Sequence, residues 1–365
     1  MKMRAHISLL LGCIGAFALG APSSGQAQQK LIYATYISDA YATTKSELWF
    51  MDEVEKRTHG QIVFERYLSG SLLKAPDLFP GLARGAADIV SGAPSAYNRK
   101  QYPLANVTLP FITEKPDVVT KAFTELFEKN ADLRREFESK NAKVLFTRGY
   151  VENTVWSRVP IATAADFKGK KVRAVLAIAD ALEKLGSVTV SMAFPDAVEA
   201  IERGIIDAMS STPFDSAASA GLQEIAKYGS DGGRMGVYAA NVFAINQKRW
   251  NSLSKEHQKI FTEVAAEARE YATKLMNEEV QKAAEKICGA KGKLKLNLFS
   301  DAEAAKVREI AGTAVRKDWL KWVSESTKAD GPKLLADYEA LVGKYDKTST
   351  YVPGFQRVQK LCGPL

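Results

Sequence analysis

Short apolar strands that alternate with amphipathic helices are the feature that most constrains the fold of this chain. The N-terminal part is predicted to run strand, helix, strand, helix, strand over residues 30–36, 46–58, 61–67, 75–84 and 87–91. The segment 61–67 (QIVFERY) alternates with the period of two expected of a half-buried strand. A helix between two strands favours parallel pairing, with helices on both faces of the sheet. The order therefore predicts an α/β fold with a mostly parallel sheet.

A second unit of the same kind follows the first. Further strands are predicted at 143–149, 153–157, around Val172, and at 187–192, 205–209 and 242–246, helices at 178–185 and 195–202, and a capped turn at 163–167. One helical pattern then runs from about Ser254 to Gly289, with a break at Asn277 as the alternative. Unbroken, it extends about 50 Å, longer than one small domain. We expect two α/β lobes joined by crossing strands and a long bracing helix.

The first 27 residues have the composition of a secretory signal peptide. Lys2 and Arg4 form a basic region, residues 7–19 are apolar, and Gly25-Gln26-Ala27 offers a cleavage site of small residues. The alternative is a lipid-attachment box at 10–13, with Cys13 as the acylated N-terminus. Cleavage after Ala27 predicts a periplasmic protein. For the remaining chain we expect residues 28–150 plus 240–278 in lobe I and 151–239 plus 279–365 in lobe II.

The cysteine count fits an oxidising compartment. Cleavage removes Cys13 and leaves the pair Cys288 and Cys362. An even number of cysteines in an exported protein makes a disulfide that holds the C-terminal tail a reasonable expectation. Two separate buried thiols are the alternative.

Charge and missing motifs narrow the function. The formal net charge of +8 falls to +6 when Lys2 and Arg4 leave with the signal. That excess is spread along the chain, which argues against nucleic acid as a partner and favours small anions. His59 and His257 have no partner at metal or triad spacing, and none of the common hydrolase, phosphate-loop, zinc or dinucleotide motifs occurs. We therefore predict no metal, no cofactor and no enzymatic activity.

A series of short motifs carries a family resemblance. In chain order they are G-A-A-D-I (85–89), L-P-F (109–111), D-F-K-G-K-K-V-R (166–173), F-P-D-A-V-E-A-I-E-R-G-I-I-D (194–207), a polar turn S-S-T-P (210–213) and N-Q-K-R-W-N-S-L (246–253). In order and spacing the chain resembles the DctP-type solute receptors of tripartite ATP-independent periplasmic (TRAP) transporters. The resemblance implies a periplasmic binding protein-like fold and a monomeric receptor that delivers a small organic acid to TRAP membrane permease subunits.

The resemblance also implies site residues. Arg173 lies in an alternating apolar run, and in the family its equivalent pairs with the carboxylate of the ligand; an internal salt bridge is the alternative. Where many relatives carry a second arginine, this chain has Asn153, or Glu152 if the register slips by one. The remaining candidates are polar or aromatic residues near the expected cleft: Ser211, Thr212, Phe214, Tyr36, Tyr41 and Tyr97. Together they favour a bulky or aromatic monocarboxylate.

Two rival functions use the same bilobed frame. A secreted enzyme could employ carboxylates such as Glu152 as acid or base, and a sensory receptor could hand its ligand to a signalling protein. Turnover of the ligand separates the first from a transport receptor.

Overall fold

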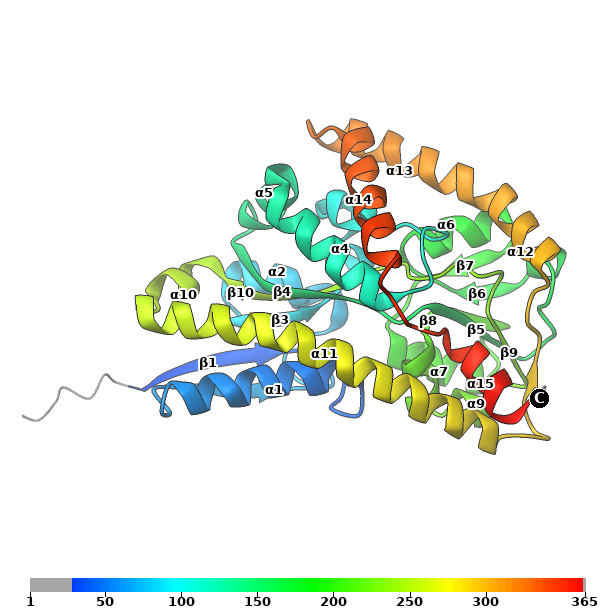
Figure 1. The fold of residues 1–365 in the computed structure, drawn as a ribbon, viewed down its shortest axis with the longest axis horizontal. Helices are drawn as coiled ribbons and strands as arrows, with labels where there is room; N and C mark the ends of the chain where they lie inside the picture. The colour runs from blue at the N-terminus through cyan, green and yellow to red at the C-terminus, as the bar shows by residue number, and fades with distance from the viewer. Residues whose placement is uncertain (1–27, 364–365) are drawn as a thin grey trace, which may run out of the picture.

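The computed structural model describes residues 28–363 and contains two β-sheets (Figure 1). The predicted signal peptide and Cys13 lie outside the described residues. In spatial order, the first sheet consists of β2 (Ile62–Tyr67), β1 (Gln29–Ala34), β3 (Ile89–Gly92), β10 (Ala240–Asn246) and β4 (Ala142–Gly149). We call this sheet with the helices packed on it lobe I.

The second sheet defines lobe II. Its spatial order is β11 (Lys295–Leu296), β9 (Tyr228–Ser230), β5 (Asn153–Ser157), β8 (Ala208–Pro213), β6 (Lys171–Arg173) and β7 (Val188–Val190). Each sheet is parallel except for one strand, β10 in lobe I and β5 in lobe II. The predicted mostly parallel α/β architecture is confirmed.

The two reversed strands follow from the path of the chain. β5 comes directly after the first crossing from lobe I to lobe II, at residues 150–152, and β10 comes directly after the return crossing, at 231–239. The parallel strands point their carboxyl ends toward the other lobe. A strand that enters from that side must therefore run the opposite way.

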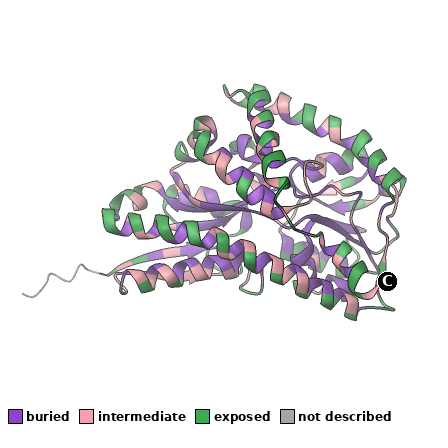
Figure 2. Cartoon of the chain, in the orientation of Figure 1, coloured by how far each residue is buried: buried purple, intermediate pink, exposed green. Residues whose placement is uncertain are grey.

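Helices cover both sheets. Those of lobe I are α1 (Ala42–Arg57), α2 (Leu78–Arg84), α3 (Pro94–Tyr97), α4 (Pro116–Lys129), α5 (Ala131–Glu138) and α10 (Gln247–Ser252), with 3-10 turns at Ala75–Asp77, Arg99–Gln101 and Leu104–Val107. Those of lobe II are α6 (Leu176–Lys184), α7 (Phe194–Glu202), α8 (Phe214–Ser219) and α9 (Leu222–Ile225), with a 3-10 turn at Ala164–Phe167. Figure 2 shows buried residues along the strands and exposed ones on the outer sides of the helices.

One long helix, α11 (Lys255–Gly289), runs along both lobes (Figure 1). The Ser254 side chain caps it by accepting the backbone N–H of His257. It packs against α1 and β4 in lobe I, and against α8 and α15 (Gly354–Cys362) at its other end. It continues through Asn277 without a break, which confirms the predicted bracing helix.

The C-terminal segment contacts lobe II, then lobe I, then the far end of α11. It contains α12 (Asp301–Val307), a π-helical turn (Arg308–Gly312), α13 (Thr313–Ser326) and α14 (Gly331–Asp346) before α15. α13 packs on α6, and α14 packs on α4. A disulfide joins Cys288 at the end of α11 to Cys362 at the end of α15, with the two Cα atoms 6.0 Å apart, so the predicted pairing is confirmed.

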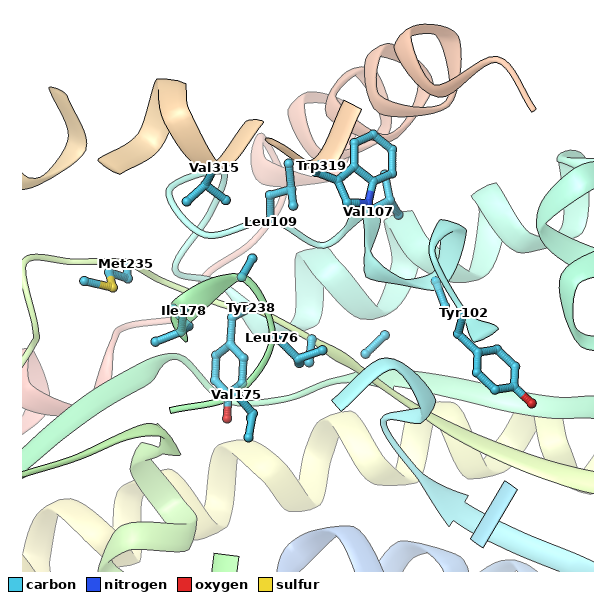
Figure 3. Packing of buried hydrophobic residues seen from close by; sticks show 14 of the residues in the cluster. Tyr102, Val107, Leu109, Val175, Leu176, Ile178, Met235, Tyr238, Val315 and Trp319 are labelled. Carbon is cyan, nitrogen blue, oxygen red and sulfur yellow. The ribbon is translucent and has the colours of Figure 1, made fainter. Parts of the chain in front are cut away.

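The apolar core is shared by the two lobes and the C-terminal helices. Figure 3 shows part of one buried cluster, in which Val175 and Leu176 lie near Tyr238, with Trp319 of α13 above them. The Trp319 indole N–H donates to the Pro103 carbonyl at 3.0 Å. No helix among residues 28–363 is long and apolar enough to cross a membrane.

Two local expectations were wrong. The strand predicted at 205–209 begins at Ala208, because Gly204 to Asp207 form the turn that brings the chain back into the sheet. The stretch 210–213, expected to be a polar turn, is the second half of β8, because its backbone pairs with β5. Short polar strands lack the apolar alternation that identifies a strand in sequence.

Candidate functional site

A cavity lies between the lobes, at the carboxyl ends of the parallel strands. It contains about 630 Å³ not filled by protein atoms, including the part open to solvent. Lobe I and the return crossing contribute Thr35, Tyr36, Ile37, Tyr41, Thr43, Ser91, Gly92, Ala93, Ala96, Tyr97, Tyr150, Tyr238, Ala239 and Asn241. Lobe II contributes Arg173, Val175, Leu176, Phe194, Ser211, Pro213 and Ser216.

Arg173 is the one charged side chain among these lining residues, and it is only 2 % exposed. It stands at the end of β6. Its Nε and Nη2 donate to the Met192 carbonyl, both at 3.1 Å, and Nη1 donates to the carbonyls of Ser210 (3.1 Å) and Ser211 (2.9 Å). Nη2 also lies 3.4 Å from the Tyr97 hydroxyl. Among the described residues, no carboxylate lies within ion-pair distance of this guanidinium.

The backbone of β8 is shaped to hold Arg173. Successive carbonyls in a regular strand point in opposite directions, yet those of Ser210 and Ser211 both face the guanidinium. Ser211 has a φ of +51°, a left-handed conformation that permits this arrangement. Its hydroxyl fixes the turn by donating to the Val175 carbonyl at 3.0 Å and accepting from the Val175 N–H at 2.9 Å. The strained residue therefore lies at the site itself.

Six aromatic rings surround the cavity: Tyr36, Tyr41, Tyr97, Tyr150, Phe194 and Tyr238. Tyr36 and Tyr97 pack edge to face with ring centroids 5.8 Å apart, as do Tyr41 and Phe194. Burial raises the pKa of Tyr36 and Tyr238 well above 10, so both phenols are neutral at physiological pH. The cavity thus offers one fixed positive charge inside a wall of neutral rings.

The structure brings five of the sequence-predicted residues together and separates four others from them. Tyr36, Tyr41, Tyr97 and Ser211 line the cavity with Arg173. Asn153, Thr212, Phe214 and Glu152 are buried but lie outside the lining. The Asn153 side-chain oxygen accepts from the Ser210 hydroxyl (3.2 Å) and the Thr212 N–H (3.3 Å). Thr212 donates to the Ser210 carbonyl, and Phe214 packs edge to face on Phe355.

Glu152 faces the C-terminal segment. Its carboxylate accepts from the Tyr351 hydroxyl at 2.5 Å and from the Gly354 N–H at 2.6 Å. Burial raises its pKa to about 7, against the opposing effect of these two hydrogen bonds. Glu152 therefore attaches the first crossing to the segment between α14 and α15.

Several lining residues were missed by sequence reasoning: Ser91, Tyr150, Phe194, Tyr238 and Asn241. Ser91 ends a strand that was predicted, and carboxyl ends of parallel strands are where ligands bind in such folds. That rule could have found Ser91. The position of Asn241 depends on pairing of β10 with β3, strands about 150 residues apart, which no local pattern reveals.

The two histidines within residues 28–363 do not line the cavity. His257 is buried at the start of α11, with Nε2 2.9 Å from the Gln61 side-chain oxygen. His59 follows α1 in a left-handed turn. Within residues 28–363, no group of three or more His, Cys, Asp or Glu side chains is arranged to hold a metal ion.

Comparison with known protein families identifies the chain. The family model DctP, "Bacterial extracellular solute-binding protein, family 7", matches residues 33–321. The chain belongs to this family. Among curated family 7 relatives, the 2,3-diketo-L-gulonate-binding periplasmic protein YiaO of Escherichia coli (strain K12) is 27% identical over 340 residues, which cover 89% of this chain and 99% of that protein.

Solved structures of TRAP solute-binding proteins share the fold. One from Desulfovibrio salexigens is 26% identical with a TM-score of 0.74, covering 89% of this chain and 99% of that one. A marine metagenome protein described as specific for aromatic acid ligands, in complex with 3-hydroxybenzoate, is 25% identical with a TM-score of 0.78, covering 88% and 99%. A Rhodoferax ferrireducens protein in complex with benzoate matches with a TM-score of 0.79 at 23% identity, which supports the fold alone.

Proposed function

We propose that this family 7 protein is a periplasmic receptor that binds a small monocarboxylate with a bulky or aromatic body and delivers it to a TRAP-type membrane permease. The observation that carries the proposal is the buried charge of Arg173. Burying an ionised group is costly unless it meets a counter-charge, and the guanidinium of Arg173 has only neutral oxygens around it. A ligand carboxylate would supply the missing charge, and a guanidinium suits it geometrically.

The aromatic wall supports the choice of ligand body. Planar rings pack well against the edges and faces of tyrosine and phenylalanine. Two of the relatives above, the Escherichia coli protein and the marine metagenome protein, bind acids of different kinds, a keto sugar acid and an aromatic acid. The six rings of this cavity favour the aromatic one.

Binding would draw the lobes together around the acid by a hinge at the two crossings. The closed form presents a surface that the empty, open form does not, so a permease can distinguish loaded from empty receptor. The predicted signal peptide at 1–27, a monomeric state and the absence of catalysis and cofactor belong to the same proposal. Because Glu152 is bonded to Tyr351 and Gly354, it is a poor candidate for an acid or base acting on the bound molecule.

The test is thermal melting of the exported protein against a panel of aromatic, sugar and aliphatic acids. A ligand at 1,000 times its Kd stabilises the native state by about 4 kcal/mol and raises the Tm by several degrees. We expect a few related acids to do so in the wild type and none in Arg173→Gln. Arg158→Gln is the matched control, since Arg158 also donates to backbone carbonyls, those of Ile201 and Glu202, but lies outside the cavity lining.

Mass spectrometry of the recovered acid completes the test. Unchanged ligand fits a receptor, whereas a converted product would favour the enzyme alternative. If no acid raises the Tm, or if Arg173→Gln responds as the wild type does, the proposed function is wrong.

A further inference from the structure

A buried carboxylate stands directly behind the lobe I wall of the cavity. Glu47 is fully buried on α1 and has no part in the lining. Its Oε2 accepts from the Tyr33 hydroxyl, and its Oε1 accepts from the Ser91 hydroxyl and from the Asn241 amide Nδ2, the latter at 3.0 Å. Two of these three donors, Ser91 and Asn241, also line the cavity.

The Glu47 carboxylate fixes the direction of the hydrogen bonds among Ser91, Asn241 and Tyr150, which together with Tyr33 and Glu47 form one hydrogen-bonded group. An ionised carboxylate only accepts, so Ser91 must turn its single proton toward Glu47. Asn241 uses one amide proton on Glu47 and the other on the Ser91 oxygen, at 3.0 Å. The Asn241 oxygen in turn takes the proton of the Tyr150 hydroxyl at 3.1 Å. The protons of Ser91, Asn241 and Tyr150 are therefore all used within this group, and none is left to donate to a ligand.

Arg148 helps to keep Glu47 ionised. Its buried guanidinium lies on the adjacent strand β4 and donates to Thr43. Burial raises the pKa of the Glu47 carboxyl, and the hydrogen bonds from Ser91 and Tyr33 and the charge of Arg148 offset part of that rise. The other hydroxyls on the lobe I lining do not donate to Glu47; they belong to Thr35, Tyr36, Tyr41, Thr43 and Tyr97.

What Ser91 and Tyr150 present to the cavity is therefore oxygen lone pairs. A ligand atom placed there can bond to the remaining lone pairs of those oxygens only by donating a hydrogen bond, whereas an acceptor atom would meet them unfavourably. No carboxylate lines the cavity to pair with an ammonium group, and burying an unpaired ammonium is more costly still. A neutral donor is the group that fits.

We infer that the acid bound between Arg173 and the Ser91–Asn241–Tyr150 patch carries a hydroxyl group directed at that patch, so the receptor selects hydroxylated acids over otherwise similar acids that lack a donor. This inference rests on the proposed function. It adds a specificity determinant, Glu47, that never touches the ligand and acts by orienting Ser91 and Asn241.

The test compares 3- and 4-hydroxybenzoate with the matching 3- and 4-fluorobenzoates by isothermal titration at pH 8. Fluorine is close to a hydroxyl in size but donates no hydrogen bond. Of the two hydroxy acids, we expect the one with the higher affinity to bind the wild type at least tenfold more tightly than its fluoro counterpart. That preference should fall to about threefold or less in Glu47→Gln, whose amide can donate back to the network and release the Ser91 proton toward the cavity.

A second variant keeps the test independent of how well Glu47→Gln folds. Ser91→Ala removes one acceptor without placing a new polar group in the core, and it should reduce the same preference. If acids bind in an Arg173-dependent way but fluoro and hydroxy acids bind the wild type within threefold of each other, the inference is wrong and the proposed function stands. If none of the acids in the wider panel binds, the proposed function fails and the inference fails with it.

Discussion

At the scale of single residues, the buried charged side chains differ in whether they line the cavity or are directed into the protein. Arg173 lines the cavity and has only neutral hydrogen-bond partners, which is why we propose it as the partner of the ligand carboxylate. Glu47 and Glu152 are directed into the protein, each held by donors from other elements. The same burial that keeps a carboxylate away from the ligand makes its protonation matter for stability.

Glu152 should therefore make stability depend on pH. Its native pKa of about 7 lies above the ordinary value of 4.5, so between these values the native state binds more protons than the unfolded state. The contribution of Glu152 to stability is greatest below pH 4.5 and is lost as the pH rises to about 7, a change of about 3 kcal/mol. Urea denaturation at pH 5 and pH 8 should show this loss in the wild type and a clearly smaller one in Glu152→Gln. Glu138→Gln, at an exposed position on α5, should retain the wild-type loss; equal losses in wild type and Glu152→Gln would contradict the assignment.

At the scale of elements, the return crossing is closely fitted against the rest of the protein. Gly236 adopts a φ of +72°, and a Cβ atom there would lie 2.4 Å from the Thr113 carbonyl oxygen. The neighbouring Val237 N–H donates to that same carbonyl at 2.8 Å, and the Gly236 carbonyl accepts from the Asn153 N–H at 2.9 Å. The crossing is thus bonded both to the 111–113 loop of lobe I and to the start of β5 at the other crossing.

Gly236→Ala should destabilise the protein by about 3 kcal/mol or more, from a left-handed conformation that costs an alanine about 1 kcal/mol and a backbone contact that must move apart. Gly60→Ala separates the two effects, because Gly60 has a similar φ of +75° and open space around its Cβ position. We expect it to lose only about 1 kcal/mol in chemical denaturation. Equal losses of unfolding free energy for the two variants would mean that the backbone at Thr113 moves aside at little cost.

How much the sequence predicts also depends on the element. The alternation of strands and helices and the unbroken α11 follow local periodicity, so they were predicted closely. Glu47 was visible in principle, since it lies on the buried stripe of α1 with Phe50, Met51 and Val54. Its partners Ser91 and Asn241 come together only through the register of β3 and β10, and that register is set by tertiary packing. The family resemblance pointed to Arg173 as a candidate, whereas the polar residues Ser91 and Asn241 could be recognised as neighbours only from the structure.

At the scale of the whole molecule, the lobes are held together at the edge of the cleft as well as through the crossings. Arg99, in the 3-10 turn after α3, donates to both oxygens of Asp180 on α6, at 2.9 and 2.6 Å. The same guanidinium lies 4.8 Å from the centre of the Trp322 ring on α13. This bidentate ion pair joins lobe I to lobe II, and neither residue lines the cavity. It should therefore stabilise the arrangement of the two lobes seen in this structure, which we take as the form that holds the ligand.

Asp180→Asn should accelerate release of a bound acid about fivefold, which corresponds to about 1 kcal/mol for a partly exposed but bidentate pair. Stopped-flow fluorescence of ligand release measures this directly, and added salt should accelerate release from the wild type more than from the variant. Asp132→Asn is the matched control, because Asp132 pairs with Arg135 on the same helix, α5, and spans no cleft. It should leave release unchanged. Identical release rates in wild type and Asp180→Asn would mean that closure depends on the ligand and the crossings alone, and that the Arg99–Asp180 pair merely accompanies it.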